Sequence, residues 1–264
     1  MEVHITPATI LVIAGHDPSG GAGIQADIET IHALGSFPAT VVSSLTVQDS
    51  RNVEGIYPVP GDLIRHQAFA ILNDYEVKAI KIGLLGSVEN AIAVADILAA
   101  NKHIPVVLDT VLAAGGGAEL STTELLETIV TRLLPHTTLV TPNSVEARRL
   151  TNETSLDQCA DMLLRAGAKA ALITGEHEQT DQVTNTLYRP NRRPTCEHWT
   201  RLPDKYHGSG CTLASAIATL LGQGVALNEA VSQAQQYTWE TLEQSLRPGK
   251  GQRIPNRCFK LRVT

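Results

Sequence analysis

The sequence predicts an α/β protein in three layers, with a mainly parallel central sheet and helices on both of its faces. Short apolar runs alternate with segments of helical periodicity along most of the 264 residues. This alternation is typical of strand–helix–strand units with right-handed crossovers. Aromatic residues make up only 4% of the chain, so its core must be built from Ala, Val, Ile and Leu. Such aliphatic cores favour parallel strands that are covered on both faces.

Six apolar runs are expected to form the parallel strands: Thr9–Ala14, Ala39–Thr46, Val77–Ile82, Val106–Asp109, Thr138–Thr141 and Ala170–Thr174. Helical patterns fall between these runs: Gly23–Leu34, Leu63–Leu72, Val88–Ala100, Thr122–Leu133 and Leu156–Ala166. Capping boxes are expected to begin the last two helices, formed by Ser121 with Glu124 and by Ser155 with Gln158.

The pattern changes in the last third of the chain. Thr184–Tyr188 and Thr195–Leu202 are predicted to be adjacent strands, followed by helices over Cys211–Gly222 and Asn228–Leu246, the second capped by Asn228. The tail, residues 247–264, contains Gly, Pro and Arg and receives no prediction. Because the chain has no linker, repeat or low-complexity segment, we expect residues 1–264 to form one domain.

Composition excludes several classes of partner. The net charge is −6, and the densest basic cluster, Arg189–Arg193, is better explained as a solvated turn than as a nucleic-acid contact. The four cysteines contain no C-x-x-C pair, which favours reduced thiols in the cytoplasm over a disulfide framework. The apolar stretch Ile10–Ala14 is too short for a signal peptide or a membrane span. We therefore expect a cytoplasmic protein that binds neither nucleic acid nor membrane.

The first motif is a glycine-rich loop between the first strand and the first helix. Four glycines, Gly15, Gly20, Gly21 and Gly23, lie within the sequence Ala-Gly-His-Asp-Pro-Ser-Gly-Gly-Ala-Gly. Ligands of open α/β sheets bind at the carboxyl ends of strands, and glycine permits a close backbone approach, so a ligand contact is favoured over an ordinary mobile connection. The dinucleotide fingerprint fits poorly because it should begin at the strand end, and a Walker A loop is absent.

The second motif, His207-Gly208-Ser209-Gly210-Cys211-Thr212, directly precedes an apolar helical pattern. Small residues at a helix start expose several backbone N–H groups, which together with the helix dipole form an anion hole suited to a phosphoryl group. In the first turn, the pKa of the Cys211 thiol is expected to be lowered, so that a thiolate could accept a proton from an attacking hydroxyl. The alternative is a small buried cysteine in the core.

The third motif is Thr141-Pro142-Asn143-Ser144-Val145-Glu146. Asn143 and Glu146 are spaced to position a hydrated Mg²⁺, but alone the motif is better explained as an N-cap with an acidic first turn. Gln48 and Asp109 follow strands at the binding edge of the sheet, where each could equally be a loop or capping residue. The nine histidines show no zinc-binding spacing.

Taken in their order along the chain, the glycine-rich loop, the Thr141–Glu146 motif and the His207–Thr212 motif resemble those of the hydroxymethylpyrimidine and phosphomethylpyrimidine kinases of thiamine biosynthesis, members of the ribokinase-like superfamily. The resemblance extends from about Ile10 to about Gly224, and pyridoxal kinases share the general plan. It implies a sheet of nine or ten strands, a homodimer, the use of ATP with Mg²⁺, and phosphorylation of 4-amino-5-hydroxymethyl-2-methylpyrimidine or its monophosphate.

The resemblance also implies roles for individual residues. Those expected around the pyrimidine are Gly15, Ala22, Asp27, Gln48, Leu84 and Val111, with Gln48 hydrogen-bonding the ring. Cys211 matches the family's proposed catalytic base, and Gly208, Ser209 and Gly210 its anion hole. On the nucleotide side, Asn143 and Glu146 match the Mg²⁺–phosphate pair, with Asp109 beside the metal and Thr174 beside the nucleotide. Sugar kinases of the superfamily carry an aspartate at the position of Cys211, so the cysteine favours the pyrimidine branch.

The chain departs from the family pattern at three places. Ala113-Ala114-Gly115-Gly116 stands where the family usually has Ala-Lys-Ser-Gly, and Thr174-Gly175-Glu176-His177 stands where it has Lys-Gly-Gly-His. His16 replaces the more common Thr. The lysine that is missing at Ala113-Ala114-Gly115-Gly116 would help to bind phosphate. Its absence therefore concerns the second phosphorylation, whose acceptor is already a monophosphate. Two alternatives therefore stay open: a pyridoxal kinase, and a non-catalytic pyrimidine-binding regulator on the same fold.

Overall fold

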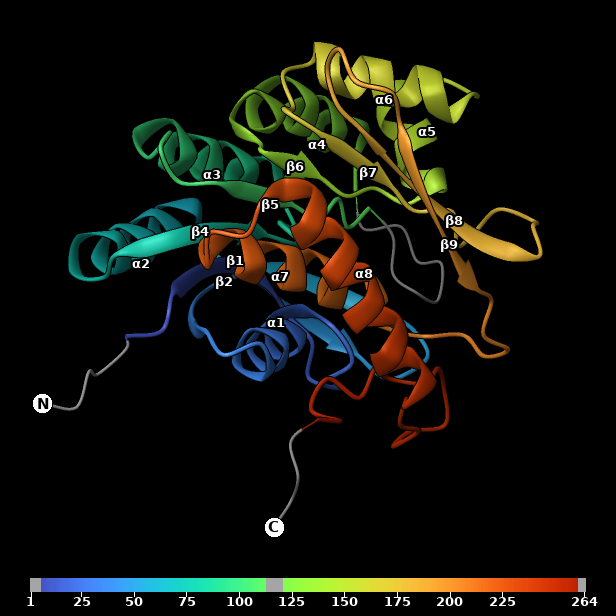
Figure 1. The fold of residues 1–264 in the computed structure, drawn as a ribbon. Coiled ribbons are helices and arrows are strands. Elements are labelled where there is room, and N and C mark those ends of the chain that lie inside the picture. Colours follow the sequence, from blue (N-terminus) through green and yellow to red (C-terminus); the bar gives the residue numbers. More distant parts are fainter. Residues whose placement is uncertain (1–5, 113–120, 261–264) are drawn as a thin grey trace, which may run out of the picture.

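The computed structural model describes residues 6–112 and 121–260 (Figure 1). Its strands are β1 (Thr9–His16), β2 (Phe37–Gln48), β3 (Val53–Pro58), β4 (Val77–Ile82), β5 (Val106–Leu108), β6 (Leu139–Val140), β7 (Ala171–Ile173), β8 (Gln182–Tyr188) and β9 (Thr195–Thr200). Its α-helices are α1 (Gly23–Ala33), α2 (Gly61–Asp74), α3 (Val88–Ala100), α4 (Thr123–Thr128), α5 (Ser144–Thr151), α6 (Leu156–Arg165), α7 (Ser209–Gly222) and α8 (Leu227–Glu243). A π-helical turn (Ile129–Leu133) and a 3-10 turn (Leu134–His136) continue α4.

All these strands belong to one sheet with the order β3-β2-β1-β4-β5-β6-β7-β8-β9. The pairings from β2 through β7 are parallel, whereas β3, β8 and β9 pair antiparallel at the two edges. The predicted three-layer, mainly parallel α/β fold is therefore confirmed. The strand order reverses beside β1, because β2 lies on one side of it and β4 on the other. Such a reversal is the place where open α/β sheets bind their ligands.

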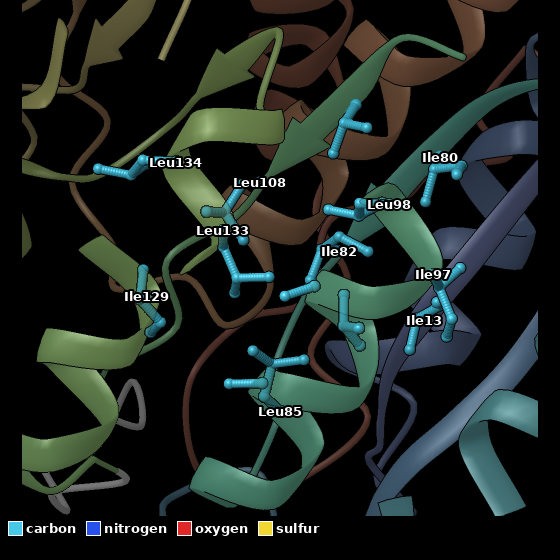
Figure 2. Packing of buried hydrophobic residues seen from close by; sticks show 14 of the residues in the cluster. Ile13, Ile80, Ile82, Leu85, Ile97, Leu98, Leu108, Ile129, Leu133 and Leu134 are labelled. Atoms are coloured by element: carbon cyan, nitrogen blue, oxygen red, sulfur yellow. The ribbon is translucent and has the colours of Figure 1, made fainter. Parts of the chain in front are cut away.

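Strand side chains alternate between two apolar layers. Leu11 and Ile13 of β1 face one layer, which α2, α3 and α4 cover, and Ile10 and Val12 face the other, which α1, α7 and α8 cover. Figure 2 shows the first layer, where aliphatic side chains from strands and helices meet without an aromatic ring among those labelled. Both faces of the central strands are thus buried, as their continuous apolar sequences predict.

The structure corrects several local predictions. Strand β3 was not expected, because its sequence contains Gly55 and Pro58 and its side chains are half-buried or exposed at the sheet edge. Such residues weaken the period-two signal. The predicted turn at Arg189–Arg193 does join β8 to β9. Among the residues that the structure describes, no helix is long and apolar enough to cross a membrane.

The predicted helix caps are wrong in three cases. Helix α4 is capped by Thr122, whose side chain accepts the Leu125 N–H, while Ser121 donates instead to the Leu112 carbonyl. Ser155 precedes α6 but makes no side-chain cap, and α8 starts after Ala226 rather than at Asn228. At α4 and α8 a shift of one or two residues in the helix start decides which side chain faces the free amides, whereas Ser155 is the N-cap residue of α6 but does not make the bond.

Candidate active site

The loop after β1 is organised from within by the side chain of Asp17. One carboxylate oxygen accepts the Ser19 N–H at 2.8 Å and the other accepts the Ala22 N–H at 2.9 Å. Gly15 packs so closely on Leu84, which follows β4, that a Cβ at this glycine would lie 2.9 Å from Leu84 Cδ2. Three residues predicted at the pyrimidine, Gly15, Ala22 and Leu84, therefore lie at the carboxyl ends of the neighbouring strands β1 and β4.

Asp17 also connects this loop to the segment that precedes α7. Nε2 of His207 donates to Asp17 Oδ2 at 2.7 Å, and the same nitrogen lies 2.9 Å from Nε2 of Gln48. Burial acts to raise the pKa of Asp17, but the hydrogen bonds from His207 and Ser19 hold it below its usual value. The Oε1 atom of Gln48 accepts from Thr46 at 3.0 Å. The Gln48 amide still has a second N–H group and a second acceptor site available for a ligand.

The start of α7 provides the predicted cluster of backbone amides. Gly208 is the N-cap with φ of 91°, a left-handed conformation that favours glycine. A side chain at this position would also collide with the Gly21 carbonyl. The first intrahelical hydrogen bond runs from the Thr212 N–H to the Gly208 carbonyl at 3.0 Å, so the amides of Ser209, Gly210 and Cys211 precede the helical ladder. The structure thus brings the predicted anion hole against the first glycine loop.

A buried ion cluster lies beneath this helix start and consists of Asp27, Lys81, Asp109 and Cys211. Nζ of Lys81 lies 2.9 Å from Asp27 Oδ1 and 3.7 Å from Asp109 Oδ2, and the Lys81 side chain is 0% exposed. Ser215 of α7 donates to Asp27 Oδ1 at 2.6 Å. Asp27, predicted at the pyrimidine, is therefore a buried partner of Lys81; its contact with a ring stays a prediction.

Electrostatics within the cluster are dominated by burial and by this single cation. Burial acts to lower the pKa of Lys81, but the Asp27 carboxylate, with help from Cys211 and Asp109, raises it above its ordinary value. Burial raises the pKa of Asp109, and Asp27 adds to this effect, while Lys81 opposes it. Because a buried charge is costly unless it is paired, Lys81 is expected to stay protonated.

The structure corrects the prediction that the pKa of the Cys211 thiol is lowered. Burial raises its pKa to about 12, against the opposing influence of Lys81. Cys211 is 8% exposed and is the third residue of α7, and the nearby Gly23 backbone acts only weakly to lower its pKa. At this position desolvation outweighs the helix dipole, which contributes only about half a charge at the helix end. The sulfur nevertheless lies where the His207–Thr212 motif meets the first glycine loop.

Asn143 and Glu146 form a full capping box at the start of α5. The Asn143 side chain accepts the N–H groups of Val145 and Glu146, and Glu146 Oε2 accepts the Asn143 N–H at 3.0 Å. Glu146 also accepts from the Leu112 N–H and the Thr110 hydroxyl, each at 3.3 Å. The structural role that the sequence favoured is thus present.

The same glutamate is electrostatically unusual. Burial raises the pKa of Glu146 to about 8, and the nearby charge of Asp109 adds to this effect. Asp109 Oδ2 is buried and has no hydrogen-bond partner among the described residues. Thr174 lies close by, since its carbonyl accepts the Ser144 N–H at 2.9 Å. The structure therefore places Asp109, Asn143, Glu146 and Thr174 along the ends of β5, β6 and β7.

The structure says less about two further segments of the predicted site. Val111 is half-buried after β5, and its N–H donates to the Asp109 carbonyl at 3.0 Å. The segment Ala113–Gly116, where the expected lysine is missing, lies outside the described residues.

Sequence reasoning missed two buried cations. Lys81 lies in the apolar run of β4, where a lysine between isoleucines signals a paired internal charge. Arg257 lies in the unplaced tail, with a side chain 0% exposed, and no local pattern marks it.

Comparison with known proteins agrees with this geometry. The profile of the family described as phosphomethylpyrimidine kinase matches residues 17–256. The hydroxymethylpyrimidine/phosphomethylpyrimidine kinase of Streptomyces coelicolor is 39% identical over 242 residues, which cover 88% of each chain. The thiamine biosynthesis bifunctional protein of Geobacter sulfurreducens is 38% identical over 92% of this chain, which spans only 51% of that relative.

A solved structure provides the corresponding likeness in three dimensions. The pyridoxal kinase from Staphylococcus aureus in complex with ADP superimposes with a TM-score of 0.88, at 25% sequence identity, over 98% of this chain and 96% of that one. The fold is therefore shared with a kinase of a different named substrate, while the sequence relationship runs to pyrimidine kinases.

Proposed function

The chain belongs to the phosphomethylpyrimidine kinase family, and on that premise we propose that it transfers the γ-phosphoryl group of ATP to the hydroxymethyl oxygen of 4-amino-5-hydroxymethyl-2-methylpyrimidine. The observation that carries this proposal is the position of Cys211. Its sulfur lies near the backbone of Gly23 in the first loop, which acts to lower the thiol pKa, and it belongs to the first turn of α7. An acceptor held by the loop and a phosphoryl group held by the α7 amides would therefore meet beside this thiol.

The amides of Ser209, Gly210 and Cys211 have the main catalytic role in this proposal. Phosphoryl transfer depends largely on positioning and on stabilising the charge of the group in flight. Backbone N–H groups at a helix start supply this stabilisation without rearrangement, because the helix already fixes their direction.

Cys211 is the proposed acceptor of the hydroxyl proton. With a pKa of about 12, it is a thiol at neutral pH, so no thiolate waits in the free protein. In a loose transition state, the bond from the attacking oxygen to phosphorus is barely formed while the bond to the leaving group is already largely broken. The hydroxyl therefore loses its proton late in the reaction. Cys211 would first release its own proton to water, and the resulting thiolate would accept the hydroxyl proton while the new O–P bond forms and the bond from phosphorus to ADP breaks. Lys81 favours the anionic sulfur during this step.

The nucleotide side fits a magnesium ion. Asp109 Oδ2 is buried without a hydrogen-bond partner in the described residues, and its charge contributes to the raised pKa of Glu146. A divalent cation would relieve both conditions, and Mg²⁺ prefers one or two carboxylates together with water and phosphate oxygens. Asp109 and Glu146 would hold it, with Asn143 and Thr174 beside the nucleotide. When bound, Mg²⁺ would neutralise phosphate charge; ATP use is supported by the ADP complex of the similar pyridoxal kinase.

The monophosphate of the same pyrimidine is the second proposed acceptor, supported by the named activities of the curated relatives. Pyridoxal is the competing acceptor, supported by the structural likeness. A homodimer, a single domain and a cytoplasmic location stay predictions from the sequence.

The proposed function is tested by ADP release from ATP–Mg²⁺ with three acceptors: hydroxymethylpyrimidine, its monophosphate and pyridoxal. We expect the highest kcat/KM with hydroxymethylpyrimidine, and no release without an acceptor. Faster turnover of pyridoxal would overturn the assignment in favour of the vitamin B6 substrate. Thermal stabilisation by the pyrimidine without any ADP release would indicate a binding protein instead of an enzyme.

A further inference from the structure

Arg257 is a fully buried arginine in the C-terminal tail, one residue beyond the segment that the family profile matches. The tail reaches the body of the protein through backbone contacts: the Asn256 N–H donates to the Thr241 carbonyl of α8 at 2.9 Å. The Tyr237 hydroxyl, also on α8, donates to the carbonyl of Arg257 itself at 2.7 Å. The backbone on both sides of the guanidinium is thus anchored on α8.

The guanidinium joins three elements that meet at the candidate active site. It donates to the carbonyls of Gly20 and Gly21 in the first loop, the former at 3.4 Å. Its Nε donates to the hydroxyl of Thr212, next to Cys211, at 2.9 Å. The same Thr212 hydroxyl donates to the Gly208 carbonyl at 2.8 Å, so the contact continues to the N-cap of α7.

Glu29 of α1 supplies the countercharge, with its Oε2 atom 3.0 Å from Arg257 Nη1. A planar fork of N–H donors can serve several acceptors in fixed directions at once. A lysine ammonium lacks this geometry, since it is a compact charge on a flexible stem. The burial of so large a cation is costly unless all its contacts are made, so the arrangement is rigid.

The two sides of the first loop are consequently held by different residues. Asp17 binds N–H groups of the loop, those of Ser19 and Ala22, whereas Arg257 binds its carbonyls. The loop then continues into Gly23, the first residue of α1, whose backbone lies near the Cys211 sulfur. The position of that backbone depends on how the preceding carbonyls are fixed.

We propose that Arg257 is a positioning residue for phosphoryl transfer: it clamps the Gly20 and Gly21 carbonyls against the first turn of α7 and thereby keeps the loop and the helix amides in register around Cys211. This inference rests on the proposed kinase function. It makes the tail part of the catalytic machinery, although the tail itself supplies no group to the reacting atoms.

The test compares Arg257→Met and Arg257→Lys with the control Lys260→Met. Lys260 is a tail cation whose side chain is 66% exposed and pairs with Glu240 at 2.8 Å. For each variant, kcat and both KM values are measured well below its melting temperature. Because misplacement by about 1 Å can cost about 100-fold in rate, we expect Arg257→Met to lower kcat by about ten- to a hundredfold. KM for ATP should change less than about twofold, and Lys260→Met should match the wild type.

Arg257→Lys and added methylguanidinium separate positioning from simple stabilisation. We expect the lysine variant to fold and to keep a lowered kcat, because one ammonium nitrogen cannot occupy the three positions from which Nε, Nη1 and Nη2 reach Thr212 and the two carbonyls. Methylguanidinium should restore part of the kcat of Arg257→Met. A lowered melting temperature with an unchanged kcat in both variants would overturn the proposal and leave Arg257 a structural residue. If Arg257→Met does not fold, the kcat of Arg257→Lys decides.

A second readout does not depend on activity. Alkylation of Cys211 by iodoacetamide is followed by peptide mass spectrometry, with the fully buried Cys159 as an internal control. Loosening the loop should accelerate alkylation of Cys211 in Arg257→Met while Cys159 stays unreactive. If the wild-type chain phosphorylated none of the acceptors, the kinase proposal would fail, yet this readout would still report whether Arg257 orders the site. Equal alkylation rates in wild type and variants would contradict the clamp.

Discussion

Asp27 and Glu146 are carboxylates near the carboxyl ends of the strands, Asp27 fully buried and Glu146 half-buried, and among the described residues Asp27 has an ion pair and Glu146 has none. Nζ of Lys81 lies 2.9 Å from Asp27, whereas Glu146 receives hydrogen bonds from neutral backbone N–H groups and one hydroxyl. The consequence appears in the pKa of Glu146, which burial and the charge of Asp109 raise to about 8. The described residues therefore supply a countercharge beside Asp27 but none beside Glu146.

This difference indicates which of the two regions would need a cation from a ligand in the proposed reaction. The region of Asp27, Lys81 and Cys211 already contains its cation before any ligand arrives, since Lys81 lies beside Asp27 inside the protein. The region of Asp109 and Glu146 has two carboxylates near each other, an arrangement that a cation arriving with the nucleotide would stabilise. Asp109 belongs to both regions, because Nζ of Lys81 lies 3.7 Å from its Oδ2 atom.

The largest expected effect comes from removing the thiol of Cys211. Cys211→Ala should lower kcat by about 10²–10⁴-fold, the usual contribution of a general base, while pyrimidine binding measured by calorimetry stays near that of the wild type. Cys159→Ala, which removes a buried thiol from the α6 region, should keep the wild-type kcat. Unchanged turnover in Cys211→Ala would remove the sulfur from the mechanism and leave only the amides.

The next effect concerns the built-in cation. Lys81→Met leaves Asp27 and Asp109 buried without their partner, so the free energy of unfolding should fall by about 3–5 kcal/mol. Lys78→Met is the matched control on the same strand: this lysine is 43% exposed, and its ion pair with Glu76 lies at the surface. Its loss should cost less than about 1 kcal/mol. Urea unfolding of both variants measures the difference, and equal losses would mean that the buried pairing contributes nothing special.

Counted per pH unit, the smallest expected effect is a slope in the pH dependence of stability. Since the pKa of Glu146 lies near 8 in the fold and near 4.5 in the unfolded chain, the folded protein holds a proton that the unfolded chain has released between these values. The stabilisation is complete below about pH 4.5 and is lost as the pH rises toward 8, by up to about 1.4 kcal/mol per pH unit.

Glu146→Gln should flatten this slope, because the amide does not titrate and can still accept in the capping box. Part of the slope should remain, since burial also raises the pKa of Asp109. Glu178→Gln is the control: its pKa is lowered to about 2 by the hydrogen bond from Arg148, so its stabilisation is lost as the pH falls from about 4.5 to 2. Urea unfolding between pH 5 and 8 should therefore show the wild-type slope in Glu178→Gln, and the same slope in Glu146→Gln would contradict the assignment.

Local patterns in the sequence predicted much of the fold and the candidate site. Val77–Ile82 and Val88–Ala100 form a strand and a helix with the predicted limits, because continuous burial and helical periodicity leave a clear signal. The glycine loop and the start of α7 meet, as their motifs indicate. The strand β3 was missed, because an edge strand with glycine and proline has a weak pattern.

What the sequence by itself determined is which segments form strands and helices and which short motifs present backbone amides, since both depend on neighbouring residues. Only the tertiary structure decided the charges around those motifs. Lys81 meets Asp27, and Arg257 meets Gly21, across separations in the chain that no local pattern spans. The thiol of Cys211 is raised rather than lowered in pKa for the same reason: its desolvation is set by the packing of α1, β4 and α7 around it, and packing is a property of the whole fold.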